Sequence, residues 1–158
     1  MKAIINVKNY GIIEVELDPS NAPITVSNFV KLANNCFYDG LTFHRIIKGF
    51  MIQGGCPIGN GTGSSKENIK GEFKANGVNN TISHKRGVIS MARAYDLNSG
   101  SCQFFICHKD SEFLDGQYAA FGHVTNGIEV VDAIAKVRTT PNDRPYVPVV
   151  IQSIRIEN

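Results

Sequence analysis

The stretch FHRIIKGFMIQGG, residues Phe43–Gly55, sets a permanent cation, Arg45, and an amide, Gln53, among residues that otherwise predict a protein core. Under strand alternation Phe43 and Arg45 share a face, as do Met51 and Gln53, and Gly49 permits a bend between the two pairs. A buried charge is costly unless something pairs with it. Arg45 therefore predicts either an internal salt bridge or a site where a ligand meets the cation, and the pattern alone leaves both open.

The composition limits the kind of partner that the chain can have. Its 158 residues fit one domain, which we expect to span 1–158. The 16 Lys and Arg residues nearly balance 14 Asp and Glu, and no run of either sign predicts a nucleic-acid or membrane surface. No apolar run reaches membrane-spanning length, and the N-terminus lacks the apolar region of a signal peptide. Four cysteines without a CxxC pair predict reduced thiols and a cytoplasmic location: Cys36, Cys56, Cys102 and Cys107.

Short segments rich in β-branched and aromatic residues predict a mainly β protein. They are KAIINV (2–7), GIIEVEL (11–17), GVISMA (87–92), QFFIC (103–107) and VPVVIQSIRIE (147–157). The turn KNYG predicts a hairpin between the first two. Only two segments predict helices, PITVSNFVKLANN (23–35) and GIEVVDAIAKV (127–137). We therefore expect a mostly antiparallel sheet closed into a barrel, with the helices over its ends.

Residues 54–86 form a long segment rich in Gly, Asn and Ser, which is typical of a functional or mobile loop. Its glycines match neither phosphate-binding pattern, because Asn60 follows Gly59 and Ser64 stands where the last glycine of GxGxxG belongs. The four histidines have no metal-ligand spacing, and there is no GxSxG elbow. We expect no metal and no cofactor, and gating of a site by this loop is a hypothesis.

The faces of these strands suggest an apolar wall with polar groups set into it. Gln103 and Phe105 share a face of QFFIC, and if that face meets Arg45 and Gln53, one guanidinium and two amides lie among Met and Phe side chains. Such a wall has no base, metal or nucleophile, and Arg does not give up its proton near neutral pH. It is suited to binding and polarising a group. Rotation about an X-Pro bond needs only that, because its barrier comes from amide resonance and no covalent bond breaks.

Taken together, FHRIIKGFMIQGG, NGTG, SMA, SCQFFIC and LDGQYAAFGHV resemble the cyclophilins, in the same order and at near-family spacing from Gly11 to the C-terminus. The resemblance implies a closed eight-stranded antiparallel β-barrel capped by two α-helices. It also implies a cofactor-free peptidyl-prolyl cis-trans isomerase that acts on proline-containing peptides and unfolded protein chains. We expect a monomer.

The resemblance also implies roles for individual residues. Arg45 takes the catalytic position, where its guanidinium stabilises the imide nitrogen as planarity is lost, and Phe50 and Gln53 complete the catalytic set. Gln53 is expected to orient Arg45. The proline ring is expected to lie against Phe50, Met51, Phe105 and Leu114. Further substrate-binding positions along the groove are Gly61, Ala92, Arg93 and Gln103, with backbone groups of Ala92 and Arg93 pairing with the peptide.

Three residues depart from the common family pattern. Phe113 stands where eukaryotic members often carry tryptophan, Tyr118 where many have histidine, and Arg93 where asparagine is common. This combination is more similar to bacterial members. Phenylalanine lacks the indole N–H that can hydrogen-bond cyclosporin, so we expect cyclosporin binding to be possible but weakened.

Two other classes of function compete with the enzyme. A proline-peptide binding module would hold a partner in the same groove with only incidental catalysis, but it could lose the cation at position 45. A structural or assembly protein has less support, because no large apolar stretch is left unexplained.

Overall fold

The chain begins with the predicted hairpin. In the computed structural model, which describes residues 1–158, β1 (Lys2–Val7) pairs antiparallel with β2 (Gly11–Leu17). Asn9 in the connecting turn has a φ of 69°, in the left-handed region that asparagine tolerates and tight hairpin turns require. Alternate residues of β1 are buried, so one face of the hairpin belongs to the core.

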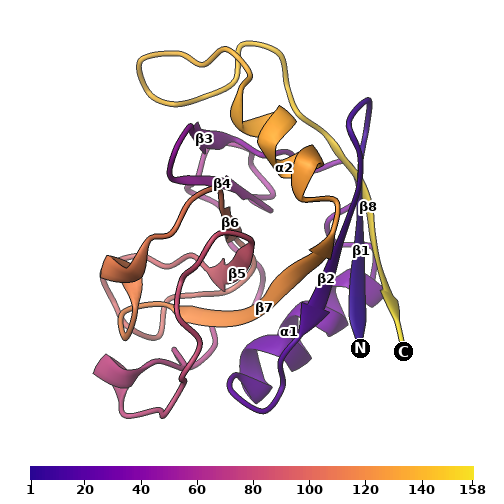
Figure 1. Cartoon of the computed structure of the whole chain (residues 1–158). Helices are drawn as coiled ribbons and strands as arrows, with labels where there is room; N and C mark the ends of the chain where they lie inside the picture. The colour runs from indigo at the N-terminus through magenta and orange to yellow at the C-terminus, as the bar shows by residue number, and fades with distance from the viewer.

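Six further strands extend the hairpin into one antiparallel sheet: β3 (Arg45–Ile47), β4 (Met51–Gly54), β5 (Val88–Met91), β6 (Phe104–Cys107), β7 (Ala119–Asn126) and β8 (Ile151–Glu157). Their order in the sheet is β3-β4-β6-β5-β7-β2-β1-β8. The sheet is curled, and both termini lie side by side because β1 pairs antiparallel with β8, with Lys2 opposite Glu157 (Figure 1). β8 begins at Ile151, whereas the sequence pattern predicted a strand from Val147. Val147 lies in the connection before β8 and is 77% exposed.

The sheet is a curled half-barrel, so the expected complete closure is wrong. Its end strands, β3 and β8, do not pair with each other. The segment before β3 meets the start of β8 only through an isolated bridge between Thr42 and Val150 and the backbone hydrogen bonds beside it. The reason lies in the β3 backbone, because the Ile46 N–H donates to the carbonyl of Asp143 in the α2–β8 connection, at 2.8 Å. A loop therefore occupies the edge that a closing strand would need.

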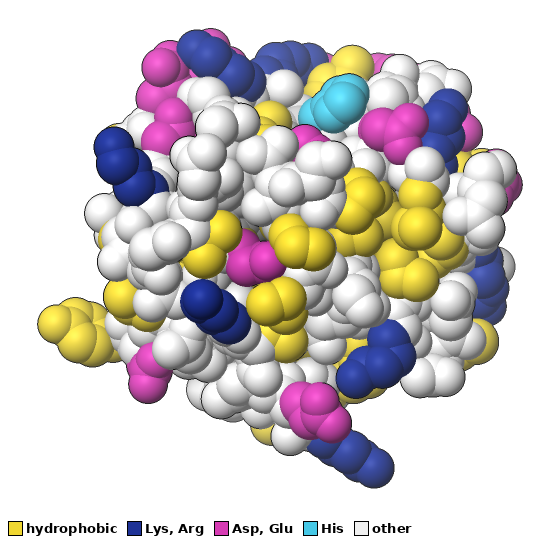
Figure 2. Space-filling model, turned by 90° about the horizontal axis from the view of Figure 1, so that it is seen from below, with side chains coloured by type: hydrophobic (Ala, Val, Ile, Leu, Met, Phe, Trp, Pro, Cys, Tyr) yellow, Lys and Arg dark blue, Asp and Glu magenta, His cyan; other side chains and the backbone are white.

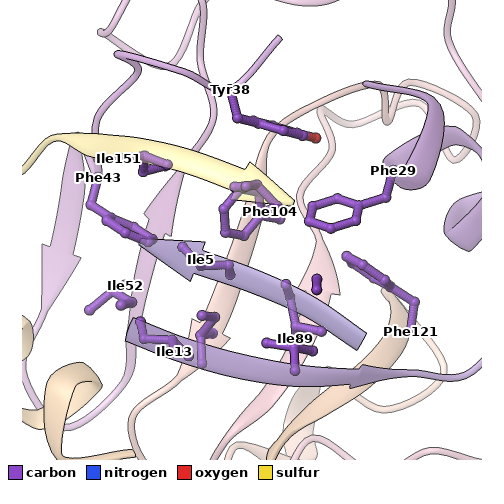
Figure 3. Packing of buried hydrophobic residues seen from close by; sticks show 14 of the residues in the cluster. Ile5, Ile13, Phe29, Tyr38, Phe43, Ile52, Ile89, Phe104, Phe121 and Ile151 are labelled. Atoms are coloured by element: carbon purple, nitrogen blue, oxygen red, sulfur yellow. The ribbon is translucent and has the colours of Figure 1, made fainter. Parts of the chain in front are cut away.

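Two helices cover opposite ends of the curled sheet (Figure 1). Helix α1 (Pro23–Asn34) starts with proline in its first turn, as predicted, and packs on β8 and β7. Helix α2 (Ile128–Ala135) packs on β2, β3 and β4. Between them lies a core of aromatic and branched side chains, with Phe29 of α1 meeting Phe104 of β6 and Phe121 of β7 (Figure 3).

The long 54–86 segment is anchored at several points despite its Gly-rich composition. Its only regular element is a short 3-10 helix, η1 (Lys74–Asn76). Phe73 is buried in the main core, and Glu72 is 2% exposed. The Glu72 carboxylate accepts hydrogen bonds from the N–H of Ile24 and the N–H and hydroxyl of Thr25, at 3.1, 2.6 and 2.7 Å. It thereby caps the N-terminus of α1, where Ala22 has no side chain to do so.

The surface carries mixed charge. On the face that Figure 2 shows, basic and acidic side chains alternate, and hydrophobic side chains form small groups. None of the helices has the length and apolar character needed to span a bilayer. The four cysteines are unpaired, with Cys36 exposed and the other three buried.

Candidate active site

The register of four neighbouring strands sorts their side chains into an inner and an outer row. The inner row faces the main core and consists of Ile46, Ile52, Ile106 and Ile89. The outer row consists of Arg45, Gln53, Phe105 and Ser90. Residues opposite one another in an antiparallel pair share a face. The predicted meeting of Arg45, Gln53 and Phe105 is therefore a direct result of strand pairing.

Arg45 itself is exposed, so the expectation of a buried cation is wrong. Phe43 does not share its face, because β3 begins only at Arg45 and Phe43 turns into the main core instead. Arg45 takes part in none of the ion pairs of the protein, which excludes the internal salt bridge. Its guanidinium is a cation at the mouth of a pocket with most of its donors free.

A chain of amides orients Arg45. Gln103 donates from Nε2 to the carbonyls of Gly61 and Gly63, at 3.0 and 2.9 Å, so its Oε1 must point the other way. That oxygen accepts from Gln53 Nε2 at 3.0 Å, and Gln53 Oε1 then accepts from Arg45 Nη1 at 3.2 Å. Because each amide has a donor end and an acceptor end, the two backbone carbonyls set the direction of the whole chain.

An apolar pocket of about 130 Å³ lies beside this chain. Its lining is Arg45, Phe50, Met51, Gln53, Ala92, Arg93, Phe105, Leu114 and Tyr118. Met51, Phe105 and Leu114 belong to a small buried cluster of their own, separate from the main core. A cation, an amide of fixed orientation and an apolar floor thus meet in one pocket.

Three of the predicted residues lie outside this pocket. Gly61 and Gln103 line a second, more polar depression of about 220 Å³, which shares Gln53, Ala92 and Arg93 with the first. Phe113 is 73% exposed, and its ring lies 5.6 Å from that of Phe50, centre to centre, at the outer rim. These residues therefore border the groove along its length.

The turns that carry the pocket residues are fixed by local hydrogen bonds. Gly49 has a φ of 81°, which permits the tight β3–β4 turn, and its N–H donates to His108 Nδ1 at 2.9 Å. The carbonyl of Phe50 accepts from the His108 N–H at 2.8 Å. His108 thereby holds the turn that presents Phe50.

Arg93 and Ala92 use much of their hydrogen-bonding capacity within the protein. The Arg93 guanidinium donates to the carbonyls of Gln117, Ala94 and Tyr95 and lies 4.8 Å above the Tyr118 ring. The N–H of Ala92 is taken by the carbonyl of Gln103 at 2.9 Å. This N–H is therefore not free to make the pairing with a bound peptide that the sequence had predicted for the backbone of Ala92.

Behind the Phe105 wall of the pocket lies a buried polar group that no motif in the sequence indicates. The ring of His84 is stacked on that of Phe105 at 6.0 Å, and His84 has no exposed surface. Its Nδ1 lies 2.8 Å from Asp115 Oδ1 and its Nε2 lies 2.8 Å from Ser90 Oγ. No local spacing indicates this triad, because its members are brought together only by the sheet and by η2 (Glu112–Leu114).

The charges of this triad follow from burial and hydrogen bonding. Burial lowers the pKa of His84 and outweighs the opposing effect of Asp115. Burial opposes ionisation of Asp115, but hydrogen bonds from Ser83 and His84 bring the pKa of its carboxyl below the ordinary value. A neutral imidazole beside a carboxylate donates from Nδ1, so Nε2 accepts from the Ser90 hydroxyl. The arrangement supports the Phe105 ring from behind.

The pocket can bind and polarise a group, but its lining offers no carboxylate, imidazole or thiol for proton transfer or nucleophilic attack. No cluster of three or more His, Cys, Asp or Glu side chains in the protein is arranged to hold a metal ion.

Comparisons with known proteins agree with this geometry. Residues 2–156 match the family described as cyclophilin type peptidyl-prolyl cis-trans isomerase/CLD. Peptidyl-prolyl cis-trans isomerase B of Bacillus subtilis is 51% identical over 117 residues, covering 74% of this chain and 78% of that protein. A peptidyl-prolyl cis-trans isomerase of Helicobacter pylori is 48% identical over 128 residues, covering 80% and 76%.

A solved structure extends the likeness to the whole fold. The cyclophilin type peptidyl-prolyl cis-trans isomerase of Cryptosporidium parvum, crystallised in the presence of the dipeptide Ala-Pro, superposes with a TM-score of 0.92 at 30% identity. The match covers 100% of this chain and 99% of that one. The chain therefore belongs to the cyclophilin family of peptidyl-prolyl cis-trans isomerases.

Proposed function

We propose that this chain accelerates cis-trans rotation of X-Pro bonds in peptides and unfolded proteins, with Arg45 as the catalytic cation. The observation that carries the proposal is the unpaired guanidinium of Arg45, held by Gln53 at the edge of an apolar pocket. The family membership and the Ala-Pro dipeptide named with the Cryptosporidium relative support the same substrate class.

The mechanism follows from the electronic structure of the imide. Planarity and a barrier of about 18–20 kcal/mol both come from delocalisation of the nitrogen lone pair into the carbonyl. In the twisted transition state that lone pair is localised and becomes a better hydrogen-bond acceptor. A donor placed near the nitrogen therefore binds the transition state more strongly than either planar isomer, which is the condition for catalysis.

The remaining residues hold the proline in place. The proline ring lies on Phe50, Met51, Phe105 and Leu114, while Tyr118 closes one side. Gln53 keeps one guanidinium donor of Arg45 occupied and thereby limits the rotation of the others. The flanking peptide runs toward Gly61, Ala92, Arg93 and Gln103, and Phe113 borders the opposite rim. A bound proline displaces water from the exposed Arg45 and thereby strengthens the contact of its guanidinium with the substrate.

The uncatalysed reaction takes tens to hundreds of seconds at room temperature, slow enough to limit folding. An isomerase that grips one proline and a few backbone groups suits many unfolded chains. The function we propose is assistance to protein folding by residues 1–158 acting as one monomeric domain. The unpaired cysteines favour a reducing compartment such as the cytoplasm.

The test is NMR exchange spectroscopy on an Ala-Pro-Phe peptide with a catalytic amount of the protein. We expect exchange cross-peaks between the cis and trans isomers that the peptide alone does not show on this timescale. If the peptide binds, as seen from shift changes at Phe105 and Leu114, but no exchange appears, the chain is a binding module and the proposal fails.

A further inference from the structure

A cavity of about 280 Å³ lies where three segments meet: Gly40–His44 before β3, Cys56–Gly59 of the long loop, and the α2–β8 connection with Arg144, Pro145 and Pro148. It shares no lining residue with the apolar pocket or with the neighbouring polar depression. Its volume is near the lower end of ligand sites, which suits a small group.

His44 provides an unsatisfied polar group in this cavity. It is 7% exposed, and neither of its ring nitrogens makes a hydrogen bond of good geometry, the Thr42 backbone being close enough only to act on the pKa of the ring. No other buried side-chain nitrogen or oxygen in the protein is left in this state. An unpartnered buried polar group is costly, and native structures contain few of them. His44 is therefore placed for a partner that the protein itself does not supply.

The charge of the cavity indicates what kind of partner fits. Arg144 lines it and joins none of the ion pairs of the protein, whereas Arg86 and Arg155 are paired with Asp132 and Asp39. The lining contains no Asp or Glu. Burial lowers the pKa of His44, and the guanidiniums of Arg144 and Arg45 add to this effect, while the nearby Thr42 carbonyl opposes it. The potential at the imidazole is positive, which favours an anion.

The other titratable group in the lining is Cys56. Burial raises the pKa of its thiol, but backbone N–H groups of Gly63, Gly61 and their neighbours more than offset this and lower it. The Gly63 N–H donates to Cys56 Sγ at 3.2 Å. The Cys56 sulfur thus already accepts a hydrogen bond, whereas the His44 ring lacks a well-formed hydrogen bond and the Arg144 guanidinium lacks an ion-pair partner.

We propose that this cavity binds an anionic oxygen group, a carboxylate or a phosphate-like oxyanion, between the guanidinium of Arg144 and the imidazole of His44. The N–H of a neutral imidazole and the guanidinium donors are both suited to oxygen acceptors. Because His44 directly precedes Arg45, an occupant would lie next to the catalytic strand without entering the proline pocket. The site goes beyond the isomerase function and does not depend on it.

The probe is sulfate, which keeps its charge across the titration, with chloride at matched ionic strength as the reference. NMR of the His44 ring nitrogens measures the pKa of the imidazole with and without sulfate. A bound anion favours the imidazolium, so the pKa rises, and a rise of about one unit at saturation corresponds to a tenfold preference for the protonated form. Arg144→Gln is expected to abolish most of this rise.

Arg138→Gln is the matched control, because Arg138 lies on the same connection but stacks on Tyr146 and does not line the cavity. It should keep the full response to sulfate. The proposal is overturned if the His44 pKa is the same in sulfate and chloride, or if Arg144→Gln and Arg138→Gln respond alike, which would mean an adventitious ion only.

A second arm identifies the source of the oxygen group. Peptides around one proline that differ only by Glu or Gln in the flanking positions are compared in binding to the native protein and to Arg144→Gln. A preference for Glu that Arg144→Gln removes assigns the site to a substrate carboxylate. A sulfate response with no preference between the peptides assigns it to a free anion. The sulfate arm requires no catalysis, so a failure of the isomerase proposal would leave it intact.

Discussion

Replacement of Gln53 by glutamate tests the amide chain most sharply, because it alters one atom type and hardly changes the shape. In the native protein Gln53 Nε2 donates to Gln103 Oε1 at 3.0 Å. In Gln53→Glu a carboxylate oxygen would face that acceptor. Either this bond is lost, or Gln103 flips and gives up its two bonds to the carbonyls of Gly61 and Gly63. The new carboxylate would also pair with Arg45 and neutralise the charge intended for the substrate.

The size of the effect can be worked from these bonds. Leaving the partly buried Gln103 Oε1 without its donor costs about 2 kcal/mol. If the transition state loses that much stabilisation, kcat/KM falls roughly 30-fold. Peptide affinity should change little, because the apolar lining is intact. The rate assay is exchange spectroscopy with the Ala-Pro-Phe peptide, run against Gln53→Met as a variant that removes the amide without adding charge.

A pH series separates this account from simple damage to the fold. A protonated glutamic acid again offers one donor and one acceptor, as glutamine does. The ratio of Gln53→Glu to native activity should therefore rise as the pH falls from 7 toward the pKa of the new carboxyl, while the ratio for Gln53→Met stays flat. Native-like activity of Gln53→Glu at pH 7, or a flat ratio, would refute the reasoning about the amide chain.

Three further predictions concern the supporting structure. Glu72→Ala should lower the free energy of unfolding, measured in urea, by about 2 kcal/mol, because α1 loses its cap. The control Glu67→Ala removes only the exposed 3.8 Å ion pair with Lys31 and should change that free energy by less than about 0.5 kcal/mol. His84 has a lowered pKa in the folded state, so the unfolded chain binds its proton first and stability falls as the pH drops below about 6.5. His84→Gln should flatten that slope, and a slope equal to that of the native protein would contradict the assignment. Phe113→Trp should tighten cyclosporin binding by about tenfold in calorimetry through one added N–H donor, and nanomolar affinity of the native protein would contradict the expected weakening.

Much of the fold follows from local pattern, and the differences have physical causes. The β1–β2 hairpin and the start of α1 at Pro23 were predictable because turn residues and apolar periodicity act within a few residues. β7 was not among the segments named from pattern, although its motif AAFGHV was part of the resemblance. Closure of the barrel could not be decided locally, since it depends on whether Ile46 donates to a strand or to the Asp143 loop.

The site was predicted in part for the same reasons. Alternation correctly placed Gln53 and Phe105 toward a common face, but it failed at Phe43, where the strand had not yet begun. Arg45 is exposed because it lies on β3, the end strand of the sheet, in the row that faces away from the main core. The His84, Ser90 and Asp115 contacts join segments from different parts of the chain, and no spacing in the sequence indicates them. The resemblance supplied Gly61 and Phe113, which the structure places around the groove and outside the apolar pocket.

The most direct test of the central claim measures peptide affinity and cis-trans exchange in one sample of Arg45→Ala. The apolar lining is unchanged in this variant, so the account predicts affinity for an Ala-Pro-Phe peptide within a few fold of native. Exchange should slow by about 10²-fold, the cost typical of losing one transition-state donor. Lys48→Ala removes a neighbouring exposed cation that does not line the pocket and should exchange at the native rate. Native-like exchange in Arg45→Ala would contradict the claim that this guanidinium stabilises the twisted imide.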